Sequence, residues 1–163
     1  MATDHPVAHP GGPIVQEVGR TGAAAPPTFD FTDEERNNFL VRMRNAVLAT
    51  VRSDGSPQAT PVWYHWDGEV IRISSPGWAR KVVNVRRDAR ISICVDDQVS
   101  GTYVTMFGRA EVISDDRVAP ESWPILLKYL HADEAAVRWD RINAAGDRVV
   151  IRLRRARSMP SLP

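Results

Sequence analysis

The chain has 163 residues, of which 43% are hydrophobic and 25% are charged, and its formal net charge is +1. This length accommodates one domain with a hydrophobic core, and a charge so close to neutral argues against a general polyanion-binding protein. The single cysteine, Cys94, excludes an intrachain disulfide and a metal site built from the cysteines of one chain.

The two ends of the chain differ in composition from its middle. Residues 1–28 are rich in proline, alanine and glycine, and they lack the basic segment and long apolar run of a signal peptide. No segment reaches the roughly 18 apolar residues that a membrane span needs. We therefore predict an N-terminal arm over 1–28, a domain over 29–157 and a C-terminal tail over 158–163, in a cytoplasmic protein without membrane contact.

The first predicted helix begins after Thr32. Thr32 and Glu35 have the spacing of a capping box, in which each side chain accepts a hydrogen bond from the backbone of the other. The helix is predicted to end near Asn45. Its buried stripe is predicted from four apolar residues at helical spacing, namely Phe39, Leu40, Met43 and Val47.

Two Asp-Gly turns separate the next three predicted strands. Asp54-Gly55 and Asp67-Gly68 are strong hairpin signals, because these residues tolerate the backbone angles of a two-residue turn. Pro61 cannot donate to a sheet ladder, so it requires a sheet edge, a bulge or a gap. The three strands are predicted over 46–52, 57–66 and 69–74.

The second half of the chain completes a mainly β protein. Gly108, within the longest strand, predicts a bend or bulge. Six strands with added helices predict a small antiparallel barrel. A helix is predicted over 79–87, with Val82, Val83 and Val85 directed inward. Strands follow over 90–95 and 103–113. A helix capped by Asp115 or Asp116, a helix over 135–142 and a strand over 148–154 complete the chain.

Residues 74–81 combine the features of an anion site. A strand, a turn and a helix start follow one another, which presents free backbone N–H groups and the positive end of a helix dipole to an anion. Ser74 and Ser75 add hydroxyl donors, and Arg80 and Lys81 add cations. The alternative is that Arg80 and Lys81 belong to a solvated helix face.

Four consecutive ring residues occupy positions 63–66. Alternation along a strand directs Trp63 and His65 to one face and Tyr64 and Trp66 to the other. One pair is predicted to lie in the core, and the other is available to line a planar ligand. No second histidine, cysteine or carboxylate stands around His65 at the sequence spacing of metal ligands. We therefore predict a packed or interface histidine and no metal site.

The sequence contains no motif of covalent or hydrolytic catalysis and no glycine-rich phosphate loop. Cys94 lies in an apolar strand, which predicts a buried and inert thiol. If the protein is an enzyme, we therefore expect a bound cofactor to supply its reactive group. A planar ring with an anionic arm matches the aromatic and anion-binding segments, and it describes a flavin or a deazaflavin.

Several short motifs carry a family resemblance through their order and spacing, over roughly residues 38–113. The chain resembles the pyridoxamine 5′-phosphate oxidase-like split-barrel family, and within it the actinobacterial branch that uses the deazaflavin F420. The motifs are Leu48-Ala49-Thr50-Val51, Asp54-Gly55-Ser56-Pro57-Gln58, Val62-Trp63-Tyr64, Ser74-Ser75-Pro76, Arg80-Lys81-Val82-Val83-Asn84-Val85-Arg86-Arg87-Asp88 and Gly108-Arg109-Ala110.

The resemblance implies a six-stranded antiparallel split β-barrel of the FMN-binding type, assembled as a homodimer with two cofactor sites at the subunit interface. It assigns Lys81 to the cofactor phosphate and Tyr103 to a contact from the second subunit. The other matched positions are Ser74, Ser75, Arg80 and Asn84 near the phosphate and tail, and Gln58, Thr60, Pro61, Val62 and Trp63 along the ring.

The cofactor implied by the resemblance is F420, with FMN as the alternative. F420 carries a phosphate and an oligoglutamate tail, which together need more cations than the single phosphate of FMN. Arg86 and Arg87 form a solvated helix end in the alternative interpretation. The cations available in the sequence for the tail are Arg80, Lys81, Arg86, Arg87 and Arg90.

We therefore expect an oxidoreductase that transfers a hydride between F420 and an unsaturated or conjugated small molecule. The alternatives are an FMN-dependent oxidase or reductase and a flavin or deazaflavin carrier without turnover. No catalytic side chain is evident, and Tyr103 and His65 are the candidate proton donors. The C-terminal run 154–157 lacks the histidine of pyridoxamine phosphate oxidases, and the near-neutral charge argues against nucleic-acid binding.

Overall fold

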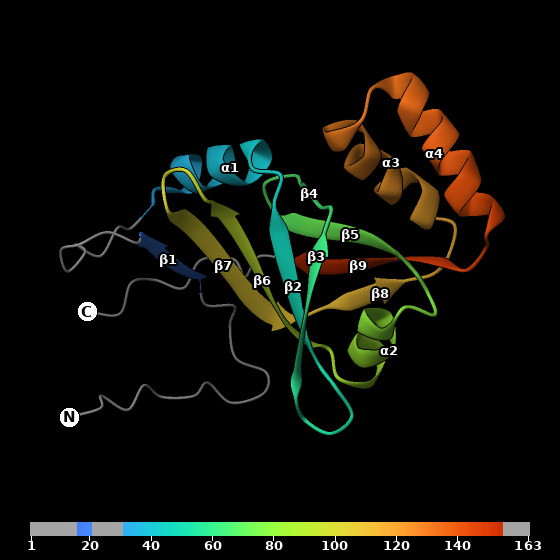
Figure 1. The fold of residues 1–163 in the computed structure, drawn as a ribbon, viewed down its shortest axis with the longest axis horizontal. Helices are drawn as coiled ribbons and strands as arrows, with labels where there is room; N and C mark the ends of the chain where they lie inside the picture. Colours follow the sequence, from blue (N-terminus) through green and yellow to red (C-terminus); the bar gives the residue numbers. More distant parts are fainter. Residues whose placement is uncertain (1–15, 21–30, 155–163) are drawn as a thin grey trace.

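The computed structural model describes residues 16–20 and 31–154, which form two antiparallel sheets and four helices (Figure 1). The five-stranded sheet contains, in spatial order, β1 (Gln16–Arg20), β7 (Thr102–Arg109), β6 (Arg90–Asp97), β2 (Ala46–Val51) and β3 (Pro57–Val62). The four-stranded sheet contains β4 (His65–Trp66), β5 (Val70–Pro76), β9 (Arg148–Arg154) and β8 (Glu111–Ile113). The helices are α1 (Asp33–Arg42), α2 (Arg80–Arg87), α3 (Val118–Tyr129) and α4 (Ala132–Ala144).

The mainly β, antiparallel architecture confirms the predicted fold class, but the described residues contain nine strands rather than six. The strand predicted over 57–66 is divided because Trp63 and Tyr64 leave the ladder. The Tyr64 backbone N–H donates to the Tyr129 hydroxyl at 3.2 Å, and the Tyr64 hydroxyl donates to the Leu40 carbonyl at 2.7 Å. Burying Tyr64 therefore takes the chain from one sheet to the other.

The strand predicted over 103–113 is also divided, at Ala110 and not at Gly108. Gly108 stays in β7 and pairs with Ile91 of β6. The Ala110 backbone N–H donates instead to the Ala89 carbonyl at 2.8 Å, and the chain then enters β8 in the second sheet. The bend predicted at Gly108 is therefore wrong by two residues, and a backbone hydrogen bond outside the ladder sets its position.

The additional strand β1 comes from the segment that the sequence assigned to the N-terminal arm. It pairs with β7 at the edge of the five-stranded sheet, where Val18 lies opposite Val104. At the other edge of that sheet lies β3, and it contains Pro61. An edge strand tolerates a missing N–H donor, so of the three alternatives predicted for this proline the structure has the sheet edge. The predicted domain boundaries and most of the arm and tail lie outside the described residues.

The predicted capping box begins α1 as expected. The Glu35 backbone N–H donates to the Thr32 hydroxyl at 3.2 Å, and the Thr32 N–H donates to the Glu35 carboxylate at 2.9 Å. The helix ends at Arg42, before the predicted end near Asn45, because the Tyr64 hydroxyl binds the carbonyls of Leu40 and Met43 at its last turn. The buried stripe ends with the helix, and Val47 lies on β2 with 37% of its surface exposed.

The other helices differ from their predictions in detail. In α2, Val82 and Val85 are buried as predicted, but Val83 is exposed because it lies about 100° around the helix from Val82. Arg117, and not an aspartate, is the N-cap of α3. The last helix, α4, is longer than its predicted range of 135–142.

The hydrophobic core lies between the two sheets and beneath α1 and α2. In β2 the buried residues alternate with outward-facing ones, so that Leu48 is inside and Val47 outside. The partly exposed outer face of the five-stranded sheet includes Cys94, contrary to the buried thiol that the sequence predicts. The largest fully buried side chains include Tyr64, Leu48, Ile71, Ile93, Met106, Ile151 and Leu153.

Helix α3 lies over the second sheet (Figure 1), and a buried ion triad joins the two. The Glu121 carboxylate lies 3.4 Å from the Nε atoms of both Arg72 on β5 and Arg152 on β9. All three side chains are at most 16% exposed. The triad fixes α3 on the sheet next to the region where the predicted site residues lie. No helix in the described part of the chain is long and apolar enough to cross a membrane.

Candidate functional site

A pocket of about 410 Å³ opens where both sheets meet α2, α3 and α4. Five of the residues predicted to bind a cofactor line it, which are Pro61, Val62, Trp63, Ser74 and Lys81. The remaining lining residues are Pro76, Ser122, Ile125, Leu126, Arg138, Ile142 and Arg148. We call this cavity the anion pocket, for the reasons that follow.

Three hydroxyl and guanidinium groups converge on one side of the anion pocket. The Arg148 guanidinium donates to the Ser74 hydroxyl from Nε at 3.2 Å and from Nη2 at 3.0 Å. The Ser122 hydroxyl of α3 donates to the same oxygen at 2.9 Å. The antiparallel pairing of β5 and β9 sets this contact, since Pro76 lies opposite Arg148.

The cations of the anion pocket are partly desolvated and repel one another. Burial lowers the pKa of Lys81, and the nearby charge of Arg148 lowers it further. Burial also lowers the pKa of Arg148, with a smaller contribution from Arg138. The lining residues include no carboxylate. An anion bound here would offset both the desolvation and the mutual repulsion.

A close backbone contact holds Arg148 next to the start of α2. The Gly77 N–H donates to the Asp147 carbonyl at 2.5 Å, and a Cβ at Gly77 would lie 2.4 Å from Oδ1 of Asp147. Asp147 itself has a φ of 48°, in the left-handed region. The glycine in the predicted anion segment therefore lets the turn before β9 approach the turn before α2.

Several predicted site residues do not line the anion pocket, and some of them join neighbouring elements of the fold. The buried Asn84 amide donates at 3.0 Å to both the Thr50 hydroxyl and the Gln58 side-chain carbonyl, and so joins α2 to β2 and β3. Ser75 is buried and Arg80 is exposed. Thr60 lies on the same side of β3 as Gln58. Contacts of Gln58, Thr60, Ser75, Arg80 and Asn84 with a cofactor stay predictions.

Tyr103 lies outside the anion pocket of its own chain. It is on β7, and the sheet order β7-β6-β2-β3 separates it from Pro61 by three strand spacings, or about 14 Å. Tyr103 is partly exposed on the outer face of the sheet. The predicted contact of Tyr103 with a cofactor therefore requires a second copy of the chain.

Trp63 forms a fixed aromatic wall at the edge of the anion pocket. Its ring stacks on Tyr129 with a centroid distance of 4.5 Å and an interplanar angle of 1°. The Tyr129 hydroxyl donates to the Arg44 carbonyl at 2.9 Å, which orients the stack. The Arg138 guanidinium lies 5.8 Å from the centre of the Trp63 ring. Trp63 is 41% exposed, so part of its surface is accessible to a ligand.

The other ring residues of 63–66 have separate roles. Tyr64 and Trp66 are buried, which confirms that one alternating pair lies in the core. His65 is partly buried on β4, and its Nδ1 has no hydrogen-bond partner within the described residues. Burial lowers the pKa of His65, and Arg72 lowers it further. No group of three potential metal ligands occurs in residues 16–20 and 31–154.

Sequence reasoning missed the three polar residues Ser122, Arg138 and Arg148 of the anion pocket, besides four apolar ones. Each of the three polar residues comes from an element distant in sequence from residues 74–81, and the contact between Arg148 and Ser74 spans 74 positions. Arg148 begins the last predicted strand, but only its pairing with β5 places it in the pocket. No local pattern in the sequence contains that information.

Lys128 gives the region around Tyr129 a testable pH dependence. Burial lowers the pKa of Lys128 to about 8, with a smaller effect from Arg44. Its ammonium group lies 3.6 Å from the centre of the Tyr64 ring and donates to the Leu40 carbonyl at 3.0 Å. Between pH 8 and pH 10 the unfolded state binds more protons than the folded state at this residue, so this residue makes the free energy of unfolding rise with pH.

We expect the Lys128→Met variant to lack this contribution. A complete difference in protonation gives about 1.4 kcal/mol per pH unit, and the partial exposure of Lys128 keeps the slope below that value. Urea unfolding of the wild-type protein and the variant at pH 7, 8, 9 and 10 measures the effect. The wild-type advantage should grow from pH 8 upward, and parallel curves would contradict the assignment.

Comparisons with known proteins found a matching family profile and similar solved structures. The sequence profile of the pyridoxamine 5′-phosphate oxidase family matches residues 32–158. A conserved hypothetical protein of Mycobacterium tuberculosis is 26% identical, with a TM-score of 0.67 over 82% of this chain and 92% of its own. An F420 reductase is 28% identical, with a TM-score of 0.57 over 75% and 93%. A heme-binding protein of Mycobacterium smegmatis, 21% identical, shares the fold with a TM-score of 0.53 over 77% and 52%.

Proposed function

Because this chain belongs to the pyridoxamine 5′-phosphate oxidase family, which binds flavin-type cofactors, we propose that it is an F420-dependent oxidoreductase acting on an unsaturated or conjugated small molecule. The observation that carries the proposal is the anion pocket, in which Lys81 and Arg148 converge beside the hydroxyl of Ser74. The similarity to an F420 reductase supports the choice of cofactor.

The residues of the anion pocket fit the phosphate of such a cofactor. Lys81 and Arg148 would hold the phosphate oxygens by charge-assisted hydrogen bonds, and Ser74 would add a hydroxyl donor. The partial burial of the two cations strengthens these contacts relative to an exposed site. The pocket lacks a carboxylate that would repel the phosphate.

The charge of the pocket favours F420 over FMN. Arg138 brings a third cation to the pocket lining, more positive charge than one phosphate needs, whereas the oligoglutamate tail of F420 adds carboxylates. Three of the five cations that the sequence offered for this tail are engaged elsewhere: Arg86 donates to the Gly77 carbonyl, Arg87 to the Val51 carbonyl and Arg90 to Asp88. Arg138 and Arg148 are therefore better candidates.

The reduced deazaflavin would supply a hydride to the substrate. The residues of this chain would bind and orient: the stacked rings of Trp63 and Tyr129 offer a rigid apolar wall next to the anion pocket. The titratable groups among the lining residues are Lys81, Arg138 and Arg148, and we assign Lys81 to the phosphate, which leaves no proton donor assigned among them. Solvent or a residue of a second subunit would complete the reduction.

We also propose that the protein is a homodimer. The outer face of the five-stranded sheet carries Val47, Cys94 and Tyr103, which are partly exposed in the single chain. A second copy on this face would bury apolar surface. The second copy would also place Tyr103 of one chain near the cofactor of the other, a contact that Tyr103 cannot make within its own chain. Sedimentation analysis tests this proposal, and a monomer at micromolar concentration would contradict it.

Titration of the purified protein with F420 and with FMN tests the proposed cofactor. We expect F420 to bind at least about 10-fold more tightly than FMN, because the tail adds charge-assisted contacts. Cofactor fluorescence measures both affinities. Binding of FMN without binding of F420 would overturn the proposal in favour of an FMN-dependent enzyme. Stopped-flow oxidation of the bound reduced cofactor by a substrate panel then separates an enzyme from a carrier, which would show no rapid selective oxidation.

A further inference from the structure

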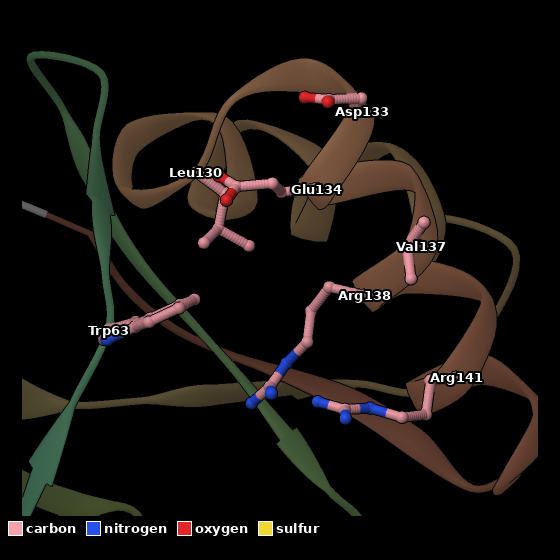
Figure 2. Close-up of a pocket in the computed structure, with 7 residues that line it drawn as sticks. All are labelled: Trp63, Leu130, Asp133, Glu134, Val137, Arg138 and Arg141. Atoms are coloured by element: carbon pink, nitrogen blue, oxygen red, sulfur yellow. The ribbon is translucent and has the colours of Figure 1, made fainter.

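A second pocket of about 380 Å³ lies between Trp63 and α4 (Figure 2). Trp63 and Arg138 line both this cavity and the anion pocket. The other lining residues, which belong to α4 or directly precede it, are Leu130, Asp133, Glu134, Val137 and Arg141. We call this cavity the α4 pocket.

The α4 pocket has charges of opposite sign at its two ends. Figure 2 shows the guanidinium groups of Arg138 and Arg141 near each other, below Trp63, and the carboxylates of Asp133 and Glu134 on the turn above. The two arginines are three residues apart on α4, a spacing that places them on one face of the helix. The pocket therefore has a basic end, at the two arginines, and an acidic end, at the two carboxylates.

The two arginines are available to a ligand. Neither guanidinium forms an ion pair with a carboxylate of the described residues, and the one recorded contact of Arg138 with an aromatic ring is with Trp63. By contrast, Glu134 is engaged, because it accepts a hydrogen bond from the His131 N–H at 3.1 Å at the start of α4. The acidic end therefore has a structural role that the basic end lacks.

Between the two charged ends the surface is apolar. Trp63, Leu130 and Val137 form this part of the lining, and Trp63 is held in place by its stack on Tyr129. Val137 is 71% exposed on the surface of α4, so its side chain is accessible to a ligand in the pocket. A ligand with an apolar body would contact these three side chains at once.

We propose that the α4 pocket binds a small organic acid, with its apolar body on Trp63, Leu130 and Val137 and its carboxylate on Arg138 and Arg141. Two adjacent guanidinium groups suit a carboxylate, because each presents paired N–H donors to its oxygens. The carboxylates at the opposite end of the pocket repel the acid group and so fix its orientation. The binding of an organic acid at this site does not depend on the proposed function. Only the further step, that such an acid is the substrate of the reductase, rests on the proposed function.

Calorimetric titration with 2-naphthoate and with the uncharged 2-naphthamide tests the proposal. The two probes share their aromatic body, so their affinity ratio isolates the carboxylate. We expect naphthoate to bind about 5-fold more tightly to the wild-type protein, a modest ratio because both arginines are exposed. In the Arg141→Gln variant the ratio should fall towards one, since Arg141 lines the α4 pocket and not the anion pocket.

The Arg148→Gln variant is the matched control. Arg148 lines the anion pocket and not the α4 pocket, so the naphthoate ratio should be unchanged while cofactor affinity falls. Equal affinities of the two probes for the wild-type protein would overturn the proposal. A ratio that survives in Arg141→Gln, or that is lost in Arg148→Gln, would do the same. Each result is independent of whether F420 or FMN binds, so failure of the proposed cofactor remains distinguishable.

Discussion

Replacement of Arg148 by glutamine should weaken cofactor binding by about 1.5–3 kcal/mol, or roughly 10- to 150-fold in affinity. Arg148 is one of the cations that would hold the cofactor phosphate, and its two hydrogen bonds to Ser74 place it at the pocket wall. Burial makes its interaction with an anion stronger than that of a surface arginine. Fluorescence titration of the variant with F420 and with FMN measures the loss for whichever cofactor binds.

The Arg52→Gln variant controls for the change of one positive charge. Arg52 is exposed in the turn between β2 and β3 and does not line the anion pocket. Its replacement should change cofactor affinity less than 2-fold at physiological ionic strength, because screening weakens distant charges. If Arg148→Gln and Arg52→Gln bind the cofactor equally well, Arg148 does not hold the phosphate.

Replacement of Glu121 by glutamine should lower the free energy of unfolding by about 3 kcal/mol. The glutamine has nearly the same shape, but it leaves the buried guanidinium groups of Arg72 and Arg152 without the carboxylate between them. Further carboxylates at these arginines, from Asp67 and Glu111, keep the effect at the lower end of the range for a broken buried ion pair. Urea denaturation followed by circular dichroism measures the change.

The matched control is Glu69→Gln, which removes an exposed ion pair. Glu69 and Arg154 lie 3.5 Å apart with side chains 68% and 64% exposed. Such surface pairs contribute between about 0 and 1 kcal/mol, so this variant should unfold almost as the wild-type protein does. A Glu121 variant that loses less than about 1 kcal/mol would show that the triad does not stabilise the attachment of α3.

The features that local sequence predicted well are those that depend on neighbouring residues. The capping box of Thr32 and Glu35 forms as predicted, and β9 has the predicted bounds of 148–154. The family resemblance also identified Lys81 and Ser74, which line the anion pocket. In each case the chemistry lies within a few positions of the chain, where propensity and spacing are decisive.

The features that sequence did not predict depend on contacts across the fold. The break at Trp63 and Tyr64 arises because the Tyr64 hydroxyl reaches the end of α1. Arg138 enters the pocket only because α4 packs against α3, and its own helix gives no sign of that function. Tertiary hydrogen bonds and packing therefore override the alternation that predicted one continuous strand over 57–66.

The position of β9 has a consequence for the order in which the molecule becomes functional. This strand is the last element of the described chain, yet it lies between β5 and β8 and carries both Arg148 and Arg152. A growing chain that ends before residue 148 would thus lack the proposed phosphate contact of Arg148 and a member of the ion triad. Anchoring of α3 and affinity for the cofactor would be acquired in the same final step, which makes ligand binding a report on complete folding.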